Sequence, residues 1–221
     1  MADLRLGVLG GTFNPIHLGH LALAESFRDR LGLDRVLFVP AGLPPHKGRE
    51  GIAAPLHRYA MLCLAVAGHP AFLASDVEVR RAGPSYSVDT IEALAADWPG
   101  ARLFFLMGSD TFLDLPTWRT PERLVTGATL AVGAREGGTF EPEGPAARAV
   151  LARIAARGWA RVPPTPLDAV MPGDVLLIDA VSLPVSACEI RGRVRRRESV
   201  RYLTPLPVAE YIAQHRLYAE A

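Results

Sequence analysis

The stretch that decides the fold reads RLGVLGGTFNPIHLGHL and spans residues 5 to 21. Residues 5–9 form an apolar run typical of a buried strand, and residues 19–31 carry apolar side chains at helical spacing. The glycines between them let the backbone approach a ligand, and a helix that begins here directs free N–H groups and its positive dipole end into the turn. Such a turn favours a phosphate. It makes Gly10, Gly11, Thr12 and Phe13 candidate phosphate-binding residues.

Two imidazoles, His17 and His20, stand at the start of the same predicted helix. Both could donate to one phosphate chain. A metal site is the alternative interpretation of a His-x-x-His spacing, but the stretch holds no HExxH motif, cysteine or acidic pair. The spacing therefore favours phosphate.

The composition is that of an ordinary globular protein. Of 221 residues, 49% are hydrophobic and 21% charged, and the net charge is +1, without the imbalance typical of general nucleic-acid or membrane-surface binders. Glycines interrupt the first apolar run, so it resembles neither a signal peptide nor a membrane span, and we expect a cytoplasmic protein. Cys63 and Cys188 fit no metal-ligand spacing and are expected to be free thiols.

Strand and helix patterns alternate along the chain. Strands are expected at 35–39, 72–79, 101–107, 129–134 and 175–178, and helices at 55–68, 87–98, 146–157 and 207–216. This order predicts an α/β fold with a doubly wound parallel sheet, in one domain over residues 1–221 with a small helical part from about residue 184. Ligands of such sheets bind outside the carboxyl ends of the strands.

Four further candidates follow predicted strands or open predicted helices. Lys47, in the loop 40–47, is a phosphate contact or a solvated lysine, and Ser87 is expected as the N-cap of the helix that follows it. Asp110 would hold a ribose hydroxyl or cap the short segment 111–115. Trp118 would stack on a flat ring or pack internally.

Near the end of the chain, Ser186 and Glu189 form a capping box that predicts a helix beginning at Ser186. Arg191 lies in its second turn, and a guanidinium near a helix start suits phosphate. The arginine-rich run 191–201 also suggests nucleic acid, but no aromatic residues interleave with it, so a solvated face is favoured.

These motifs together resemble a known family. GGTFNPIHLGH resembles the GGTFDPxHxGH signature of the nucleotidylyltransferase superfamily, and PPHK (44–47), GPSYSVDT (83–90), GSD (108–110), Trp118 and VSACEIR (185–191) follow in the order seen in bacterial nicotinate-nucleotide adenylyltransferases. The resemblance runs from the first strand to the C-terminal helix. The alternatives are an adenylyltransferase of the same superfamily acting on nicotinamide mononucleotide or phosphopantetheine, a cytidylyltransferase, and a non-catalytic nucleotide sensor.

The resemblance implies a Rossmann-like fold and adenylyl transfer from ATP to nicotinate mononucleotide in NAD biosynthesis, with Mg²⁺ as cofactor. It implies ATP and nicotinate mononucleotide as partners, without nucleic acid or membrane; a homo-oligomer stays open. The implied catalytic residues are His17, His20 and Arg191. ATP or its phosphates would be bound by Gly10, Gly11, Thr12, Phe13, Lys47 and Ser186; the mononucleotide by Ser87, Thr90, Asp110 and Trp118; no side chain is assigned to a metal.

Three residues depart from the family pattern. Asn14 stands where Asp is common, which removes a negative charge beside the phosphates. Cys188 replaces the usual Ser or Thr of the late motif, and Arg119 stands where many relatives carry Tyr.

Overall fold

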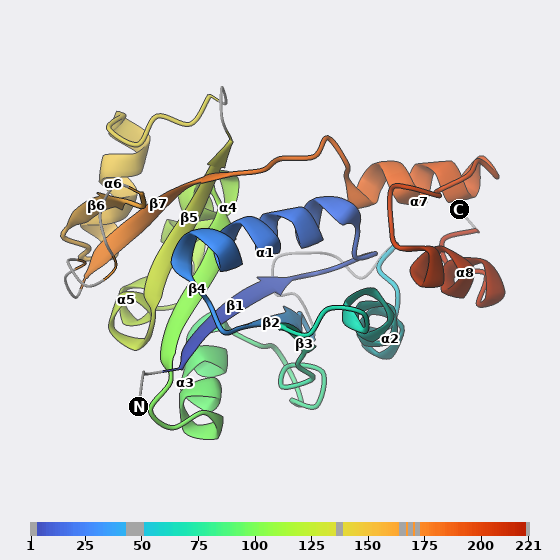
Figure 1. Cartoon of the computed structure of the whole chain (residues 1–221), viewed down its shortest axis with the longest axis horizontal. Helices are drawn as coiled ribbons and strands as arrows, with labels where there is room; N and C mark the ends of the chain where they lie inside the picture. The colour runs from blue at the N-terminus through green and yellow to red at the C-terminus, as the bar shows by residue number, and fades with distance from the viewer. Residues whose placement is uncertain are drawn as a thin grey trace. The chain divides into compact units, whose positions relative to one another are not determined.

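The computed structural model describes residues 4–42, 51–135, 139–163, 167, 170 and 173–219 (Figure 1). Its strands form a seven-stranded sheet in the order β3-β2-β1-β4-β5-β7-β6, and the predicted doubly wound parallel sheet is confirmed. Contacts divide the chain into two units. The first comprises residues 1–9, 23–36 and 86–182, and the second comprises residues 10–22, 37–85 and 183–221.

Parallel strands build the first unit, and most of them carry apolar residues on both faces, as strands covered on both sides do. They are β1 (Arg5–Gly11, whose last two residues belong to the second unit), β4 (Arg102–Gly108), β5 (Thr129–Arg135), β6 (Gly158–Arg161) and β7 (Asp174–Ala180). Val8 lies opposite Phe105, which lies opposite Leu130, which lies opposite Val175, and these four side chains form part of the core.

Helices accompany these strands in the chain, and α1 packs on the sheet at close range. They are α1 (Leu18–Leu31), α3 (Ser87–Asp97), α4 (Ser109–Asp114), α5 (Leu124–Gly127) and α6 (Pro145–Arg153). A Cβ on Gly133 of β5 would lie 3.0 Å from Leu23 Cδ1 and 3.1 Å from Phe27 Cζ. Glycine at this position therefore lets α1 approach the sheet directly.

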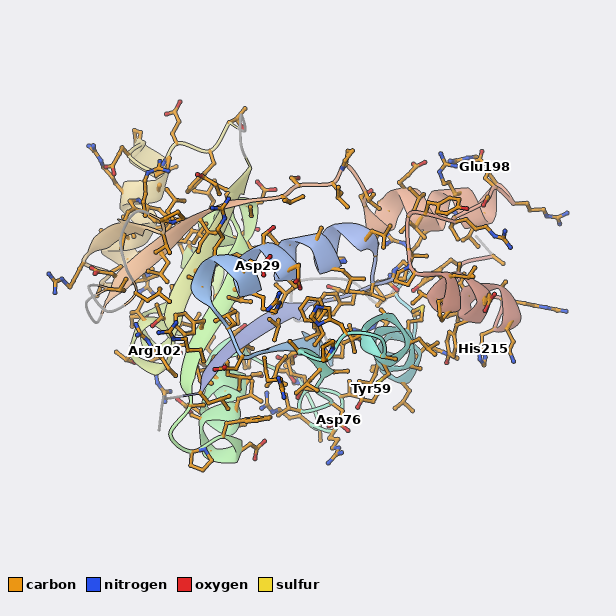
Figure 2. The ribbon with its side chains drawn as sticks, in the orientation of Figure 1. Asp29, Tyr59, Asp76, Arg102, Glu198 and His215 are labelled. Atoms are coloured by element: carbon orange, nitrogen blue, oxygen red, sulfur yellow. The ribbon has the colours of Figure 1, made fainter. Side chains whose placement is uncertain are left out.

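The second unit contains most of β2 (Arg35–Pro40), together with β3 (Phe72–Ala74), α2 (Pro55–Val66), α7 (Ala187–Arg195) and α8 (Leu206–Gln214). Helices α2 and α8 pack together. At their contact His57 Nδ1 lies 2.9 Å from Tyr211 Oη, and the Tyr211 ring lies 4.1 Å from that of His215, labelled in Figure 2.

Several predicted boundaries are wrong. The strand expected at 72–79 ends at Ala74, because the chain turns at Asp76, whose carbonyl accepts Arg80 N–H at 2.9 Å. The helix expected at 146–157 ends at Arg153, and Ala155 follows with a left-handed φ of 55°. The four-residue strand β6 is absent from the prediction.

The predicted cap at Ser87 is also wrong, and of the two alternatives for Asp110 the helix cap is not found. The N-cap of α3 is Tyr86, and Ser87 is the first helical residue. Helix α4 begins at Ser109 after Gly108, so Asp110 lies in the first turn and caps nothing. By contrast the cap at Ser186 is confirmed, because Ser186 Oγ accepts Glu189 N–H at 3.1 Å.

Candidate active site

The glycine-rich turn lies at the carboxyl end of β1, as predicted. The strand continues through Gly11, and Phe13 then takes a left-handed φ of 46° with its ring buried. A Cβ on Gly11 would lie 3.1 Å from this ring, which also packs edge-on against His20 at 5.0 Å. A side chain at Gly11 would therefore press against the Phe13 ring.

His17 and His20 are brought together by the first turn of α1. Their rings stack with centroids 3.6 Å apart, and His17 N–H donates to His20 Nδ1 at 3.3 Å. A neutral His20 that accepts at Nδ1 carries its proton on Nε2, so it presents one N–H donor. His17 Nδ1 is buried and has no hydrogen-bond partner in the part of the chain that the structure describes.

Burial sets the charge of this pair. Desolvation lowers the pKa of His17 to about 4, and desolvation together with the nearby His17 lowers the pKa of His20 to about 3. Both rings are therefore neutral at pH 7 in the free protein. A bound polyanion would raise both values, because it favours the charged imidazolium.

The same pKa shifts predict lower stability in acid. Unfolded histidine titrates near 6.5, above both folded values, so the unfolded chain alone binds these two protons between about pH 6.5 and 4. The free energy of unfolding should fall as pH falls through this window, by up to about 1.4 kcal/mol per pH unit for each histidine. Urea unfolding at pH 7, 6 and 5 measures the slope. The variant carrying His17→Gln and His20→Gln should show a shallower slope, and an unchanged slope would refute the assignment.

Arg191 is brought to the turn from α7. Its Nη1 donates to the main-chain oxygen of Asn14 at 2.8 Å, and no other hydrogen bond of its guanidinium is found among the described residues. The preceding segment lies close to the start of α1, since a Cβ on Gly19 would lie 3.5 Å from Val185 O. Helix α7 thus presents a cation at the phosphate-binding turn.

Arg58 lies beneath the turn and was missed by sequence reasoning. Its side chain is 1% exposed, and its three nitrogens donate to the carbonyl oxygens of Ala53, Thr12 and Gly42 at 3.0, 2.8 and 2.9 Å. Burial lowers the pKa of this guanidinium, which the nearby Tyr218 and Glu78 partly offset. No local pattern marks this residue, because its partners come from three separate loops.

The predicted mononucleotide residues lie in the first unit. Ser87 and Thr90 occupy the first turn of α3, and Thr90 is 2% exposed. Asp110 is exposed on α4 after β4, and Trp118 packs edge-on against buried Phe105 at 6.1 Å. Arg119, which departs from the family pattern, places its guanidinium 4.6 Å from the ring centre of Tyr86. Lys47 lies outside the described residues.

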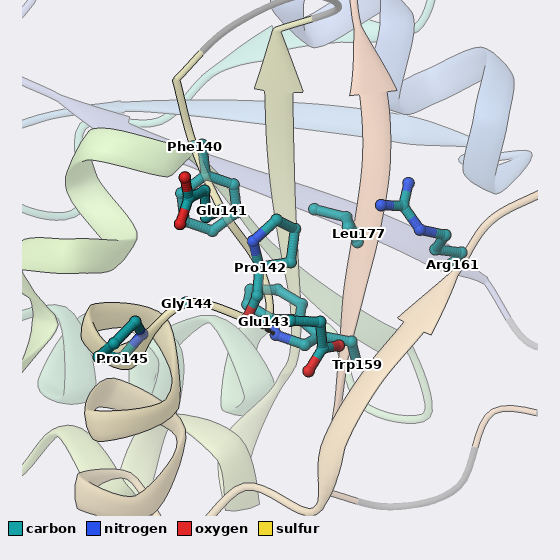
Figure 3. Close-up of a pocket in the computed structure, with 9 residues that line it drawn as sticks. All are labelled: Phe140, Glu141, Pro142, Glu143, Gly144, Pro145, Trp159, Arg161 and Leu177. Carbon is teal, nitrogen blue, oxygen red and sulfur yellow. Dashed lines mark hydrogen bonds between the residues drawn. The ribbon is translucent and has the colours of Figure 1, made fainter.

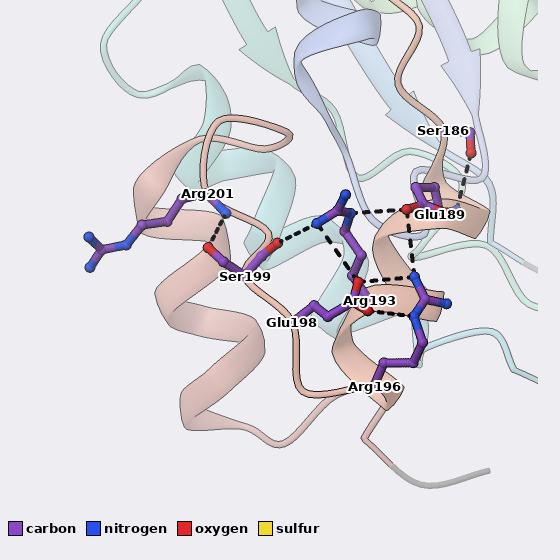
Figure 4. A network of polar contacts seen from close by, with 7 residues as sticks. All are labelled: Ser186, Glu189, Arg193, Arg196, Glu198, Ser199 and Arg201. Atoms are coloured by element: carbon purple, nitrogen blue, oxygen red, sulfur yellow. Dashed lines mark hydrogen bonds and ion pairs between the residues drawn. The ribbon is translucent and has the colours of Figure 1, made fainter.

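Charged residues on α7 and just after it form ion pairs with one another. Glu189 and Glu198 form ion pairs with both Arg193 and Arg196, the shortest being Arg196 Nε to Glu198 Oε1 at 2.9 Å (Figure 4). Glu189 therefore takes part in the helix cap only through its N–H, which donates to Ser186 Oγ. Its carboxylate instead accepts from Arg193 in these ion pairs.

A separate hollow of about 760 Å³ lies in the first unit, lined by residues that include Phe140, Trp159, Arg161 and Leu177 (Figure 3). None of the predicted site residues that the structure describes lines it. Trp159 Nε1 donates to Pro142 O at 2.8 Å, which closes one wall. Within the described residues, no helix is long and apolar enough to span a bilayer, and no three His, Cys, Asp or Glu side chains converge on a metal position.

Comparison with known proteins identifies the family. The cytidylyltransferase-like family model matches residues 8–193. A relative from Thermomicrobium roseum named probable nicotinate-nucleotide adenylyltransferase is 44% identical, covering 97% of this chain and 91% of its own. The chain belongs to the nicotinate-nucleotide adenylyltransferase family. A relative from Geobacter sulfurreducens, also named probable nicotinate-nucleotide adenylyltransferase, is 43% identical over 98% of this chain and 99% of its own.

Solved structures of proteins named as members of the nicotinate-nucleotide adenylyltransferase family share the fold of this chain. Plasmodium falciparum nicotinic acid mononucleotide adenylyltransferase complexed with NaAD has a TM-score of 0.70 at 16% identity, over 97% of both chains. A Vibrio parahaemolyticus structure titled as a nicotinate-nucleotide adenylyltransferase has a TM-score of 0.64 over 98% of this chain and 96% of that one.

Proposed function

We propose that this protein transfers the adenylyl group of ATP to nicotinate mononucleotide, forming nicotinate adenine dinucleotide and pyrophosphate. One buried atom of the site carries the proposal. His17 Nδ1 has no hydrogen-bond partner among the described residues, and it lies at the start of a helix, where an anion is favoured. Family membership supports the choice of reaction, because the relatives from T. roseum and G. sulfurreducens bear this activity in their names.

The reaction needs alignment more than it needs a strong base. An oxygen of the mononucleotide phosphate, already an anion, forms a bond to the α-phosphorus of ATP. The bond from that phosphorus to the bridging oxygen breaks, and its electron pair leaves with pyrophosphate. Catalysis therefore rests on placing two polyanions together and stabilising the charge that develops, without a covalent enzyme intermediate.

We assign ATP to the turn and to the residues around it. The backbone N–H groups of residues 10–13 and the neutral imidazoles of His17 and His20 would donate to the phosphates, and Arg191 and Lys47 would supply positive charge. Ser186 is exposed at the start of α7, and its hydroxyl keeps its proton free to donate while its oxygen accepts from Glu189.

We assign the mononucleotide to four residues of the first unit. The Asp110 carboxylate would accept from ribose hydroxyls, and the half-buried Trp118 would stack on the pyridine ring. Ser87 offers a hydroxyl in the first turn of α3. Thr90, almost fully buried, would support this turn from within.

Mg²⁺ is proposed to enter as a complex with ATP. It prefers oxygen ligands, keeps several of its waters and is held mainly through substrate phosphates. The described residues fit that mode, because they offer no cage of three side-chain ligands. When bound, Mg²⁺ would neutralise charge on the departing pyrophosphate.

A rate comparison tests the proposal. Purified protein with ATP and Mg²⁺ should release pyrophosphate with nicotinate mononucleotide at least about 10-fold faster than with nicotinamide mononucleotide, because an acceptor site tuned to one charge state leaves polar groups unpaired with the other. Phosphopantetheine serves as the control acceptor and should give no product. Faster turnover with either alternative would reassign the acceptor, and the absence of turnover with all three would indicate a nucleotide sensor.

A further inference from the structure

Asn14 joins the phosphate-binding turn to three other parts of the second unit. Its Nδ2 donates to Gly51 O at 2.9 Å, and its Oδ1 accepts Ala53 N–H at 3.0 Å. Its main-chain oxygen accepts Arg191 Nη1 at 2.8 Å. Because the side chain is buried, a change in its hydrogen bonds moves the backbone that holds Arg191.

The third partner of the Asn14 side chain is Tyr218, 204 residues along the chain. Tyr218 Oη donates to Asn14 Oδ1 at 2.8 Å. The tail after α8 reaches this point through two left-handed residues, Arg216 at φ 50° and Tyr218 itself at φ 62°. Such conformations are unfavourable for residues with a Cβ and persist where surrounding contacts specify them.

The charge state of Tyr218 fixes the direction of this bond. Burial raises the pKa of its phenol, and the neighbouring cations Arg191 and Arg58 offset only part of that effect. The hydroxyl is therefore protonated at neutral pH and donates, while the amide oxygen of Asn14 accepts. Both cations sit near enough to the phenol to act on it.

We propose that Tyr218 is a positioning residue for ATP: its hydroxyl holds Asn14, and Asn14 holds the guanidinium of Arg191 in place for the phosphates. Tyr218 itself touches no substrate in this arrangement. The inference rests on the proposed function, because it takes ATP to be the ligand of the turn.

Tyr218→Phe tests it by removing one hydroxyl and keeping the ring. Calorimetry with ATP and Mg²⁺, in the absence of any acceptor, should show the dissociation constant for ATP raised by about 3- to 10-fold, the equivalent of one lost hydrogen bond. The thermal midpoint should change little, and the KM for nicotinate mononucleotide should stay the same. Tyr202→Phe is the matched control, because Tyr202 is 89% exposed, and it should bind ATP as wild type does.

An Arg191→Ala background separates positioning from a general structural role. If Tyr218 acts through Arg191, Tyr218→Phe should weaken ATP binding by less than about 2-fold when Arg191 is already absent, since coupled residues are not additive. An equal loss in both backgrounds would overturn the route through Arg191. Wild-type protein that binds ATP no better than Tyr218→Phe would overturn the inference alone, whereas wild-type protein that fails to bind ATP would overturn the proposed function as well.

Discussion

His20→Ala is expected to lower kcat by about 10²-fold or more, the usual loss when one preorganised donor is removed from a site of developing charge. His20 accepts the His17 N–H at Nδ1, which leaves Nε2–H as its single donor, and its ring is fixed between His17 and Phe13. Alanine removes the donor and the ring that orients His17. The measurement is kcat at saturating ATP and nicotinate mononucleotide.

Two companion variants sharpen that test. His20→Gln keeps an N–H donor and should recover part of the lost rate. His215→Ala, on the exposed end of α8, should turn over as wild type does. Near-wild-type kcat in a folded His20→Ala protein would show that the histidine pair does not take part in catalysis.

Arg58→Met is expected to cost about 3 kcal/mol or more of unfolding free energy. Its guanidinium satisfies three carbonyl oxygens, those of Thr12, Gly42 and Ala53, in a place where water does not replace it. Each buried acceptor left without a donor costs about 1–3 kcal/mol. Urea unfolding monitored by circular dichroism measures the change.

Arg58→Lys probes the geometry of the same site. Lysine keeps the charge but lacks the planar fork that reaches three acceptors. The unfolding free energy of Arg58→Lys should therefore lie between those of wild type and Arg58→Met. Arg80→Met removes an exposed arginine whose ion pair is with Asp76, and it should cost no more than about 0.5 kcal/mol. A loss below about 1 kcal/mol for Arg58→Met would show that the buried cation is dispensable.

Features set by short-range chemistry could be predicted from the sequence. The apolar runs of β1 and β4, the glycine turn and the Ser186 cap each depend on residues within a few positions, and all are found as expected. Strand β6 could not be predicted, because its four residues carry no apolar run. Its pairing, with Trp159 opposite Val175, is supplied by the neighbouring strand β7.

Helix α2 shows why the support beneath the site could not be predicted. The helical spacing of its apolar residues predicts an inner face through Leu56, Tyr59, Ala60, Cys63 and Ala67. The buried residues are instead Arg58, Met61, Leu62 and Val66. The buried face is offset from this pattern by about one residue, and its first buried residue is the cation Arg58. A buried arginine becomes favourable only when distant carbonyl groups accept its hydrogen bonds. The apolar periodicity of one helix carries no information about those distant groups.

The bonds between the start and the end of the chain also bear on its synthesis. Leu18 N–H donates to Leu203 O at 3.0 Å, and Thr204 Oγ1 donates to Ile16 O at 2.8 Å. At the usual speed of translation, the ribosome adds the intervening residues in roughly 10 to 40 seconds. Residues 16–18 therefore wait for residues 203 and 204, and a nascent chain stalled before Leu203 would carry the signature turn without these two hydrogen bonds.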